Sequence, residues 1–221
     1  LAQDSVSVGP RSTTIGVRAI SIGSDSAGNG ASSIALGAGA TSDGVASLSA
    51  GLASGASGKF ASAVGAFSSA GGDFSLVLGS ALQDANGNVV KGATAAATSS
   101  IVIGQAAETT ATATNSIAIG TQAVTSNAGA VAIGPGANAA GLNGVALGNG
   151  AGATGDDSSA FGHGATANKL NTTATGAGAQ AIGADATATG AHSLASGDNS
   201  TATGANSRAS GQSSNAYGHG A

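Results

Sequence analysis

Glycine recurs at every seventh position over most of this sequence. The spacing holds through residues 9–79, returns at Gly104 and, after a shift of two positions, runs through residues 120–218, where only Asn127 and Lys169 interrupt it. A short and regular period is typical of a solenoid, in which each repeat stacks only on its neighbours. We therefore expect function to lie on the outer surfaces of a stacked repeat, and not in the cleft of a globular domain.

The composition limits the classes of partner. The chain has 221 residues with 39 glycines, 7% charged residues and a net charge of −4. Such a composition often indicates disorder, but glycines in strict phase indicate ordered turns. The negative charge disfavours nucleic acid and anionic membranes as partners. Because the sequence has no Met and no long apolar run, we expect a piece of a longer protein whose anchor lies outside it.

The segments between glycines alternate with a period of two, which predicts short β-strands. One strand type, as in Ser116–Gly120 and Ala130–Gly134, carries large aliphatic residues. The other type, as in Ala123–Asn127 and Ala137–Gly141, carries small or polar residues. The two types take turns along the chain, so the structural repeat is a coil of fourteen residues with two strands and two turns. The predicted class is an all-β parallel solenoid.

Both strand types keep small residues, mainly Ala and Ser, at alternate positions, and these fit the interior of a thin coil. The first strand type then presents its aliphatic side chains outward. A soluble protein does not leave such a stripe in water, so we expect an obligate oligomer whose aliphatic stripes meet. In the alternative phasing, the aliphatic residues fill the coil and the oligomer is not needed. The predicted interface residues are Ile20, Ile22, Ile34, Leu36, Leu76, Leu78, Ile101, Ile103, Ile117, Ile119, Val131, Ile133, Val145 and Leu147.

The regular spacing breaks between Gly79 and Gly104, and the chain is accordingly divided into repeats at 1–79, an insert at 80–103 and repeats at 104–221. Within the insert, residues 82–91 have Asn-Gly at their centre, which predicts a hairpin. The hairpin is either a ligand-binding finger or a brace against a neighbouring chain. The candidate contact residues are Asp84, Asn86, Gly87, Asn88 and Lys91. A second break, at 105–115, adds two residues and predicts a widened turn.

Beyond Phe161, threonine replaces the aliphatic residues of the outward columns, as in Thr173/Thr175 and Thr187/Thr189. Regular Thr-x-Thr ladders on a β-solenoid are compatible with ice binding. In the alternative interpretation, Thr substitutes for Val in a continuous β column. The continuity of the columns favours this second interpretation.

No catalytic or metal-binding constellation can be assembled, and no cofactor is expected. Residues 150–155 match G-x-G-x-x-G, but no crossover helix follows, so dinucleotide binding is not indicated. His163, His192 and His219 fall in predicted turns without a pair of carboxylates. An acyltransferase of the left-handed β-helix class is disfavoured, because its coil has eighteen residues. We therefore predict that the chain is not an enzyme.

The segments Asn115–Gly120, Asn143–Gly148 and Ser33–Gly37 resemble the head repeat of trimeric autotransporter adhesins of the YadA-like type, and the resemblance covers nearly the whole chain. It implies a left-handed parallel β-roll assembled as a parallel homotrimer and displayed on the outer membrane of a Gram-negative bacterium. It also implies attachment to host extracellular matrix, to cells or to other bacteria. The neck, stalk and membrane anchor of such proteins are missing from this sequence. No ligand-binding residue can be transferred from the family.

Overall fold

The computed structural model of the chain describes residues 2–221; Leu1, the first residue of the predicted 1–79 segment, lies outside the described residues. These residues contain no helix, and hence no helix that could cross a membrane. Between Ser116 and Ile117 the chain divides into two compact units, called here the first and the second unit. Each unit is an all-β parallel solenoid, as the sequence predicts.

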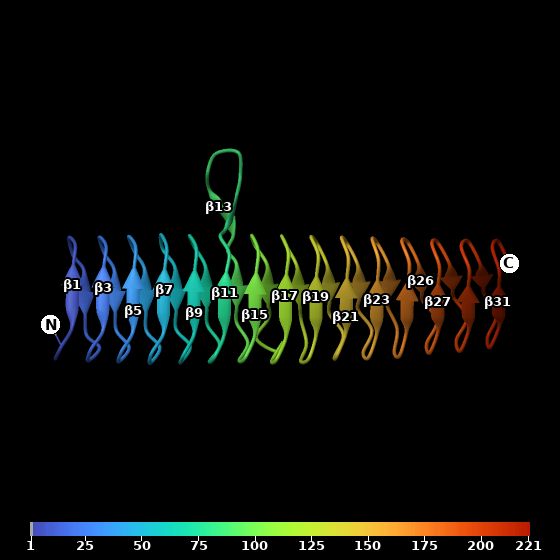
Figure 1. Cartoon of the computed structure of the whole chain (residues 1–221), viewed down its shortest axis with the longest axis horizontal. Helices are drawn as coiled ribbons and strands as arrows, with labels where there is room; N and C mark the ends of the chain where they lie inside the picture. The colour runs from blue at the N-terminus through green and yellow to red at the C-terminus, as the bar shows by residue number, and fades with distance from the viewer. Residues whose placement is uncertain (1) are drawn as a thin grey trace. The chain divides into compact units, whose positions relative to one another are not determined.

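The first unit holds two parallel sheets and a separate hairpin (Figure 1). Its first sheet contains, in order, β1 (Val6–Val8), β3 (Ile20–Ile22), β5 (Ile34–Leu36), β7 (Leu48–Ala50), β9 (Ser62–Val64), β11 (Leu76–Leu78) and β15 (Ile101–Ile103). Its second sheet contains β2 (Thr13–Thr14), β4 (Ala27–Gly28), β6 (Thr41–Ser42), β8 (Gly55–Ala56), β10 (Ser69–Ala70), β14 (Thr94–Ala95) and β16 (Glu108–Thr109). The hairpin pairs β12 (Leu82–Gln83) with β13 (Val89–Lys91) in antiparallel fashion.

The second unit repeats the arrangement without a hairpin. Its first sheet contains β17 (Ile117–Ile119), β19 (Val131–Ile133), β21 (Val145–Leu147), β23 (Ser159–Phe161), β25 (Thr173–Thr175), β27 (Thr187–Thr189), β29 (Thr201–Thr203) and β31 (Asn215–Tyr217). Its second sheet contains β18 (Val124–Thr125), β20 (Asn138–Ala139), β22 (Gly152–Ala153), β24 (Thr166–Ala167), β26 (Gln180–Ala181), β28 (Leu194–Ala195) and β30 (Arg208–Ala209).

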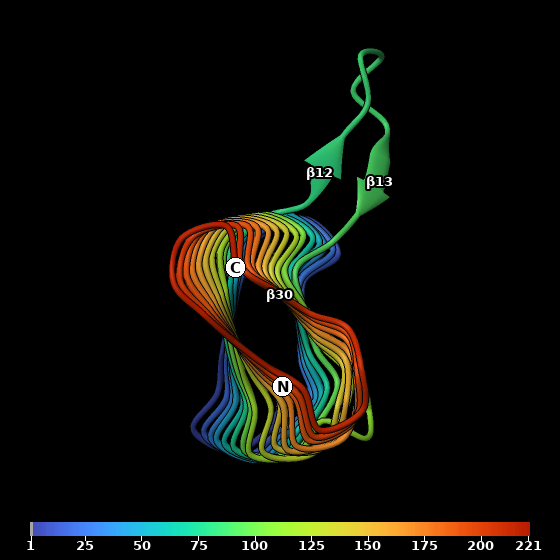
Figure 2. The ribbon, with the colours of Figure 1, turned by 90° about the vertical axis from the view of Figure 1, so that its right-hand side faces the viewer.

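Within each unit, neighbouring strands of a sheet pair in strict register. Their partners are fourteen residues apart, except on either side of the hairpin, where Leu76 pairs with Ile101 and Ser69 with Thr94, twenty-five residues apart. In the second unit Ile117 pairs with Val131, and Val131 pairs with Val145. Each coil thus crosses once through each sheet, and Figure 2 shows the two strands of the coils joined by turns at both edges. The strict register places equivalent residues of successive coils directly beside one another, so columns of like side chains form.

The turns explain the glycine spacing. In the turn Gly134–Ala137, the Ala137 amide donates a hydrogen bond to the Gly134 carbonyl at 3.1 Å, and Gly136 has a φ of +64°. Pro and Gly at the two central positions are the residues that a type II turn prefers. Gly134 itself has a φ of +132°, and a Cβ atom there would lie 2.5 Å from the carbonyl oxygen of Gly148 in the next coil. Glycine is therefore required both by the backbone conformation and by the close stacking of coils.

The interior of each coil consists of small side chains, as predicted. Ala35 in the first unit and Ala118 and Ala132 in the second are fully buried. Buried serines pair across the coil, for example Ser42 with Ser47 at 2.6 Å between their hydroxyl oxygens. The alternative phasing, with aliphatic residues inside the coil, is therefore wrong for the predicted interface residues, none of which is buried.

The first unit has one exception to the small interior. Val77 and Val102 are fully buried at interior positions that alanine or serine occupies in other coils. They lie side by side, since β11 pairs directly with β15. These two strands flank the insert in the sequence, and the sequence pattern alone did not predict the larger interior at this place.

The insert is narrower than the predicted range 80–103. The hairpin occupies residues 82–91, whereas β14 and β15 pair in register with neighbouring coils. The hairpin extends away from the coils beyond their turns (Figure 2). The second break forms a widened turn between β16 and the end of the first unit, in which the Ala113 amide donates to the Thr110 carbonyl at 3.0 Å.

Candidate adhesion surfaces

The first candidate surface is the aliphatic ridge that each unit carries on the outward face of its first sheet. It consists of the fourteen predicted interface residues. In the first unit, Ile22 and Leu78 keep 43% and 41% of their surface exposed, and in the second unit Ile133 keeps 39%. The remaining members are partly or largely exposed. Contiguous exposed apolar surface of this kind marks an interaction site in soluble proteins.

The strict register brings the ridge residues together within each unit. In the first unit Ile22 lies beside Leu36, and Leu78 lies beside Ile103. In the second unit the pairing is continuous. The column directly before the turn glycines contains Ile119, Ile133 and Leu147. The predicted residues are thus neighbours in space, although they are spread along the sequence.

The sequence prediction omitted several residues that occupy the same columns. Val6 and Val8 of β1 keep 46% and 54% of their surface exposed, and Val64 keeps 36%. Leu48 pairs with Ile34 in register and continues the ridge. These residues lie either one or three positions before a glycine of the repeat, as the predicted interface residues do. This spacing was the signal in the sequence that could have identified them.

In the second unit the same outward columns continue as threonine. Thr173, Thr187 and Thr201 pair in register, as do Thr175, Thr189 and Thr203. The burial pattern of β25 and β27 equals that of β19, with a buried alanine between two outward residues. The threonine columns are therefore the geometric continuation of the aliphatic columns within this unit.

The second candidate surface is the hairpin, where the structure places Asp84, Asn86, Gly87 and Asn88 at the exposed tip. The Asp84 carboxylate accepts hydrogen bonds from the backbone amides of Asn86 and Asn88, at 2.9 and 2.8 Å, and from the Asn88 side chain at 2.9 Å. These bonds, chiefly the one from the Asn88 side chain, lower the pKa of Asp84. The Asp84 and Asn88 side chains therefore stabilise the tip itself.

Lys91 lies at the base of the hairpin and is held by the coil. Its ammonium Nζ is 2.6 Å from Oε2 of Glu108 in β16, and both side chains are about one-third exposed. A partly shielded pair between the hairpin and the second sheet restricts how the hairpin leaves the coil. All four predicted contact residues at the tip are exposed, but the Asp84 and Asn88 side chains are engaged with the tip itself.

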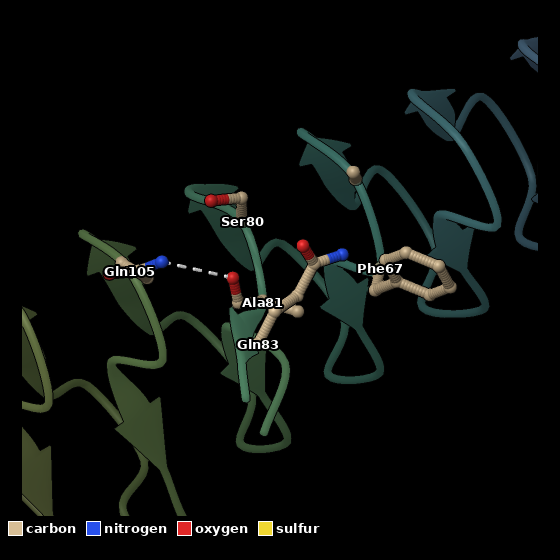
Figure 3. A pocket seen from close by; sticks show the side chains of 6 residues that line it. Phe67, Ser80, Ala81, Gln83 and Gln105 are labelled. Atoms are coloured by element: carbon tan, nitrogen blue, oxygen red, sulfur yellow. Dashed lines mark hydrogen bonds between the residues drawn. The ribbon is translucent and has the colours of Figure 1, made fainter. Parts of the chain in front are cut away.

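A hollow of about 340 Å³ lies beside the hairpin base, and sequence analysis did not predict it. Ala66 and Phe67 come from the turn after β9, and Gln105 comes from the turn after β15. The chain entering the hairpin supplies the rest of the lining, namely Ser80, Ala81 and Gln83 (Figure 3). These residues converge only because the hairpin leaves the coil between two turns, so no local sequence motif indicates the hollow.

The remaining polar side chains form short ladders on the turns. Asn143 donates to the Asp157 carboxylate at 3.0 Å, and Asn171 donates to the Asp185 carboxylate at 3.0 Å, in each case across one coil. His163, His192 and His219 lie on turns, as predicted. Residues 2–221 contain no group of three or more side chains that could hold a metal ion.

Coils of fourteen residues, a small-residue interior and an outward aliphatic ridge define the class of the protein as a β-roll repeat. A family model, the YadA head domain repeat, matches residues 2–26, 56–81, 95–123, 111–137, 126–151, 153–179, 181–200 and 195–221. The chain belongs to this family, the head repeats of trimeric autotransporter adhesins.

One solved structure that matches is the collagen-binding domain of the Yersinia adhesin YadA. The sequence identity is 18%, the match covers 99% of this chain and 83% of that chain, and the TM-score is 0.24. A search of curated proteins finds no match.

Proposed function

We propose that this chain is the head of a trimeric surface adhesin in which three copies bury their aliphatic ridges against one another. The observation that carries the proposal is the exposure of the ridge: Ile22, Leu78 and Ile133 each leave about two-fifths of their surface in water. Complete burial of such a side chain contributes ~1.5–3 kcal/mol, so burying the remaining two-fifths contributes roughly 0.6–1.2 kcal/mol. Because these residues recur in successive coils, the total is large enough to hold chains together against the entropy lost on association.

The decisive experiment changes Ile119 and Ile133 to Asp in the same chain. Both lie in the column directly before the turn glycines of the second unit. Charged side chains there would be buried without partners in the proposed trimer. We expect multi-angle light scattering to show that the double variant is no longer trimeric. Asn138→Asp is the matched control, because Asn138 is exposed on the outward face of the second sheet, and it should remain trimeric. A well-folded monomer of the unaltered chain would refute the proposal.

The adhesin would be displayed on the outer membrane of a Gram-negative bacterium and would attach it to extracellular matrix, host cells or other bacteria without catalysis. Family membership supports this role. A panel of immobilised matrix proteins and cells, tested with the intact trimer and with a variant lacking residues 82–91, measures the attachment. If the hairpin is a binding finger, its removal abolishes binding of a ligand; if it is a brace, its removal weakens the trimer first.

Ice binding remains the second candidate, because the paired threonine columns of β25, β27 and β29 form a regular outward array. Their continuity with the aliphatic columns of the second unit instead supports a shared interface. Thermal hysteresis measured on the purified chain decides between the two. We expect no hysteresis, and a clear freezing-point depression at micromolar concentration would favour ice binding.

A further inference from the structure

We propose that the hollow beside the hairpin base is a binding site for a neutral sugar unit of a glycan. This inference rests on the proposed adhesin role, since it names a class of ligand for it, but it does not depend on the trimer. The hollow measures about 340 Å³, which falls within the range of ~300–1,000 Å³ usual for small-molecule sites. The ring of Phe67, the amides of Gln83 and Gln105 and the fixed position of the hairpin base support this assignment.

Phe67 supplies an apolar wall from a turn between two strands of a coil. Its φ is +57°, in the left-handed region, where the equivalent turns of earlier coils have Asp25 and Gly39. This conformation belongs to the repeated turn, since non-glycine residues of many other turns, among them Ser32 and Gln122, also have a φ of +57°. The Phe67 amide donates to the Leu52 carbonyl at 2.8 Å, so the stacked coils fix this conformation.

Two other phenylalanines share the left-handed conformation but not the surroundings. Phe60 and Phe74 lie in turns at the other end of the strands, and their rings stack on each other with centroids 5.3 Å apart. Each therefore has an aromatic neighbour within the chain. Phe67 instead lines the hollow together with Ser80, Gln83 and Gln105 (Figure 3). The backbone conformation therefore does not distinguish Phe67 from the other two rings, whereas its place beside the hollow does.

The polar groups around Phe67 match the hydroxyl groups of a sugar. The Gln83 carboxamide is exposed and has no hydrogen-bond partner among residues 2–221. Gln105 donates from Nε2 to the Ala81 carbonyl at 3.1 Å, which holds its amide plane in place. A carboxamide both donates and accepts hydrogen bonds, as adjacent sugar hydroxyls do. The aromatic ring can then cover the apolar C–H face of the same sugar.

The ligand is expected to be neutral, because none of the six lining residues carries a charge. A charged group placed there would lose water without gaining an ionic partner. The nearby Lys91 does not offset this, since it is paired with Glu108 at 2.6 Å. The site is therefore distinct in chemistry from one that selects sialylated or sulfated glycans.

The base of the hairpin is held in position before a ligand arrives. The Ala81 amide donates to the Ala66 carbonyl at 3.0 Å, and the Lys91–Glu108 pair ties the other hairpin strand to β16. A preorganised site loses less entropy on binding than a mobile loop. The hollow is thus suited to the weak, repeated binding that a surface with several identical copies would use.

The test applies the intact protein to an array of neutral and sialylated glycans, followed by calorimetric titration of the strongest neutral binder. We expect Phe67→Ala and Gln83→Ala each to lower the affinity about tenfold or more. Phe74→Ala is the matched control, because it removes an aromatic ring from a left-handed turn position away from the hollow, and its affinity should be unchanged. Circular dichroism checks that each variant is folded.

Absence of binding to any neutral glycan would overturn the proposal, and so would an equal loss of affinity in Phe67→Ala and Phe74→Ala. Light scattering on the same samples separates this outcome from the proposed trimer. A trimer that binds no sugar refutes only the hollow as a site. A folded monomer that binds a neutral sugar through Phe67 and Gln83 refutes only the trimer.

Discussion

Two stretches of the second unit share one backbone but differ in their outward chemistry. Strands β17, β19 and β21 present aliphatic residues, whereas β25, β27 and β29 present threonine. Gly134 and Gly190 have φ values of +132° and +128°, and the next coil approaches both equally closely. Glycine and alanine therefore determine the coil, and the outward columns can differ without changing it.

The first and largest test of this comparison replaces the turn glycines. Gly134→Val and Gly176→Val should each destabilise the protein by about 3–5 kcal/mol, because a Cβ atom at either position would lie 2.5–2.6 Å from backbone atoms of the next coil. The loss should be equal in the two stretches. Urea denaturation followed by circular dichroism measures it.

Gly152→Ala is the control for the glycine substitutions. A Cβ atom at Gly152 would meet nothing within 4 Å, and its φ is not in the left-handed range. Its stability should change little or increase slightly, since alanine restricts the unfolded chain. A marked difference between the Gly134 and Gly176 variants would show that the ridge, and not the coil, dominates local stability.

A second test enlarges the interior. Ala132 and Ala188 are fully buried between their neighbours, one in each stretch. Replacing either with Val should cost about 1–3 kcal/mol, because close-packed interiors resist added methyl groups. The measurement is the midpoint of thermal unfolding at fixed protein concentration. If only the variant in the threonine stretch tolerates Val, the two interiors are not equivalent.

Much of this interior could be predicted from the sequence, because glycine spacing and small-residue columns are local signals repeated many times. Val77 and Val102 show where the prediction ends. Their burial depends on the coils that flank the hairpin, and the rule of small interior residues did not extend to them. The outward position of the ridge was predictable because a period of two separates the two faces of every strand.

The hollow could not be predicted, because it requires residues from two turns and from the start of the hairpin. Phe67 in particular looks like any other turn residue in the sequence. The contact residues proposed at the tip were chosen from the Asn-Gly signal, which correctly indicated a turn. That signal could not show that the Asp84 carboxylate accepts hydrogen bonds within the tip.

The third test exchanges the outward chemistry of the two stretches. If the threonine columns lie in the trimer interface, Thr187→Val together with Thr189→Val should stabilise the trimer by about 1 kcal/mol per chain, because a methyl group replaces a buried hydroxyl. The control is Thr166→Val on the outward face of the second sheet, which should have little effect. The readout is the concentration dependence of the melting temperature. Destabilisation by the double substitution would place these threonines in contact with water.

The smallest effect concerns the turns, where side chains one coil apart form either ionic or neutral pairs. Asn171 reaches Asp185 in the threonine stretch, whereas in the first unit the Arg11 guanidinium donates to both carboxylate oxygens of Asp25 at 2.6 and 2.7 Å. The pKa of Asp25 is lowered from 3.8 to about 2. The main cause is the hydrogen bond from Arg11, and the second cause is the hydrogen bond from Ser24.

A lowered folded-state pKa means that the contribution of Asp25 to stability is complete above its ordinary pKa of 3.8 and is lost as the pH falls through about 2. The pair is exposed, so the effect on unfolding should be slight and should weaken in high salt. Carboxyl chemical shifts in an NMR titration measure the pKa directly. In Arg11→Gln the pKa of Asp25 should return toward its ordinary value, whereas Arg18→Gln, in a turn at the other edge of the coil, should leave it unchanged. An Asp25 that titrates normally in the unaltered protein would show that the turns, like the outward columns, tolerate exchange of partners without energetic consequence.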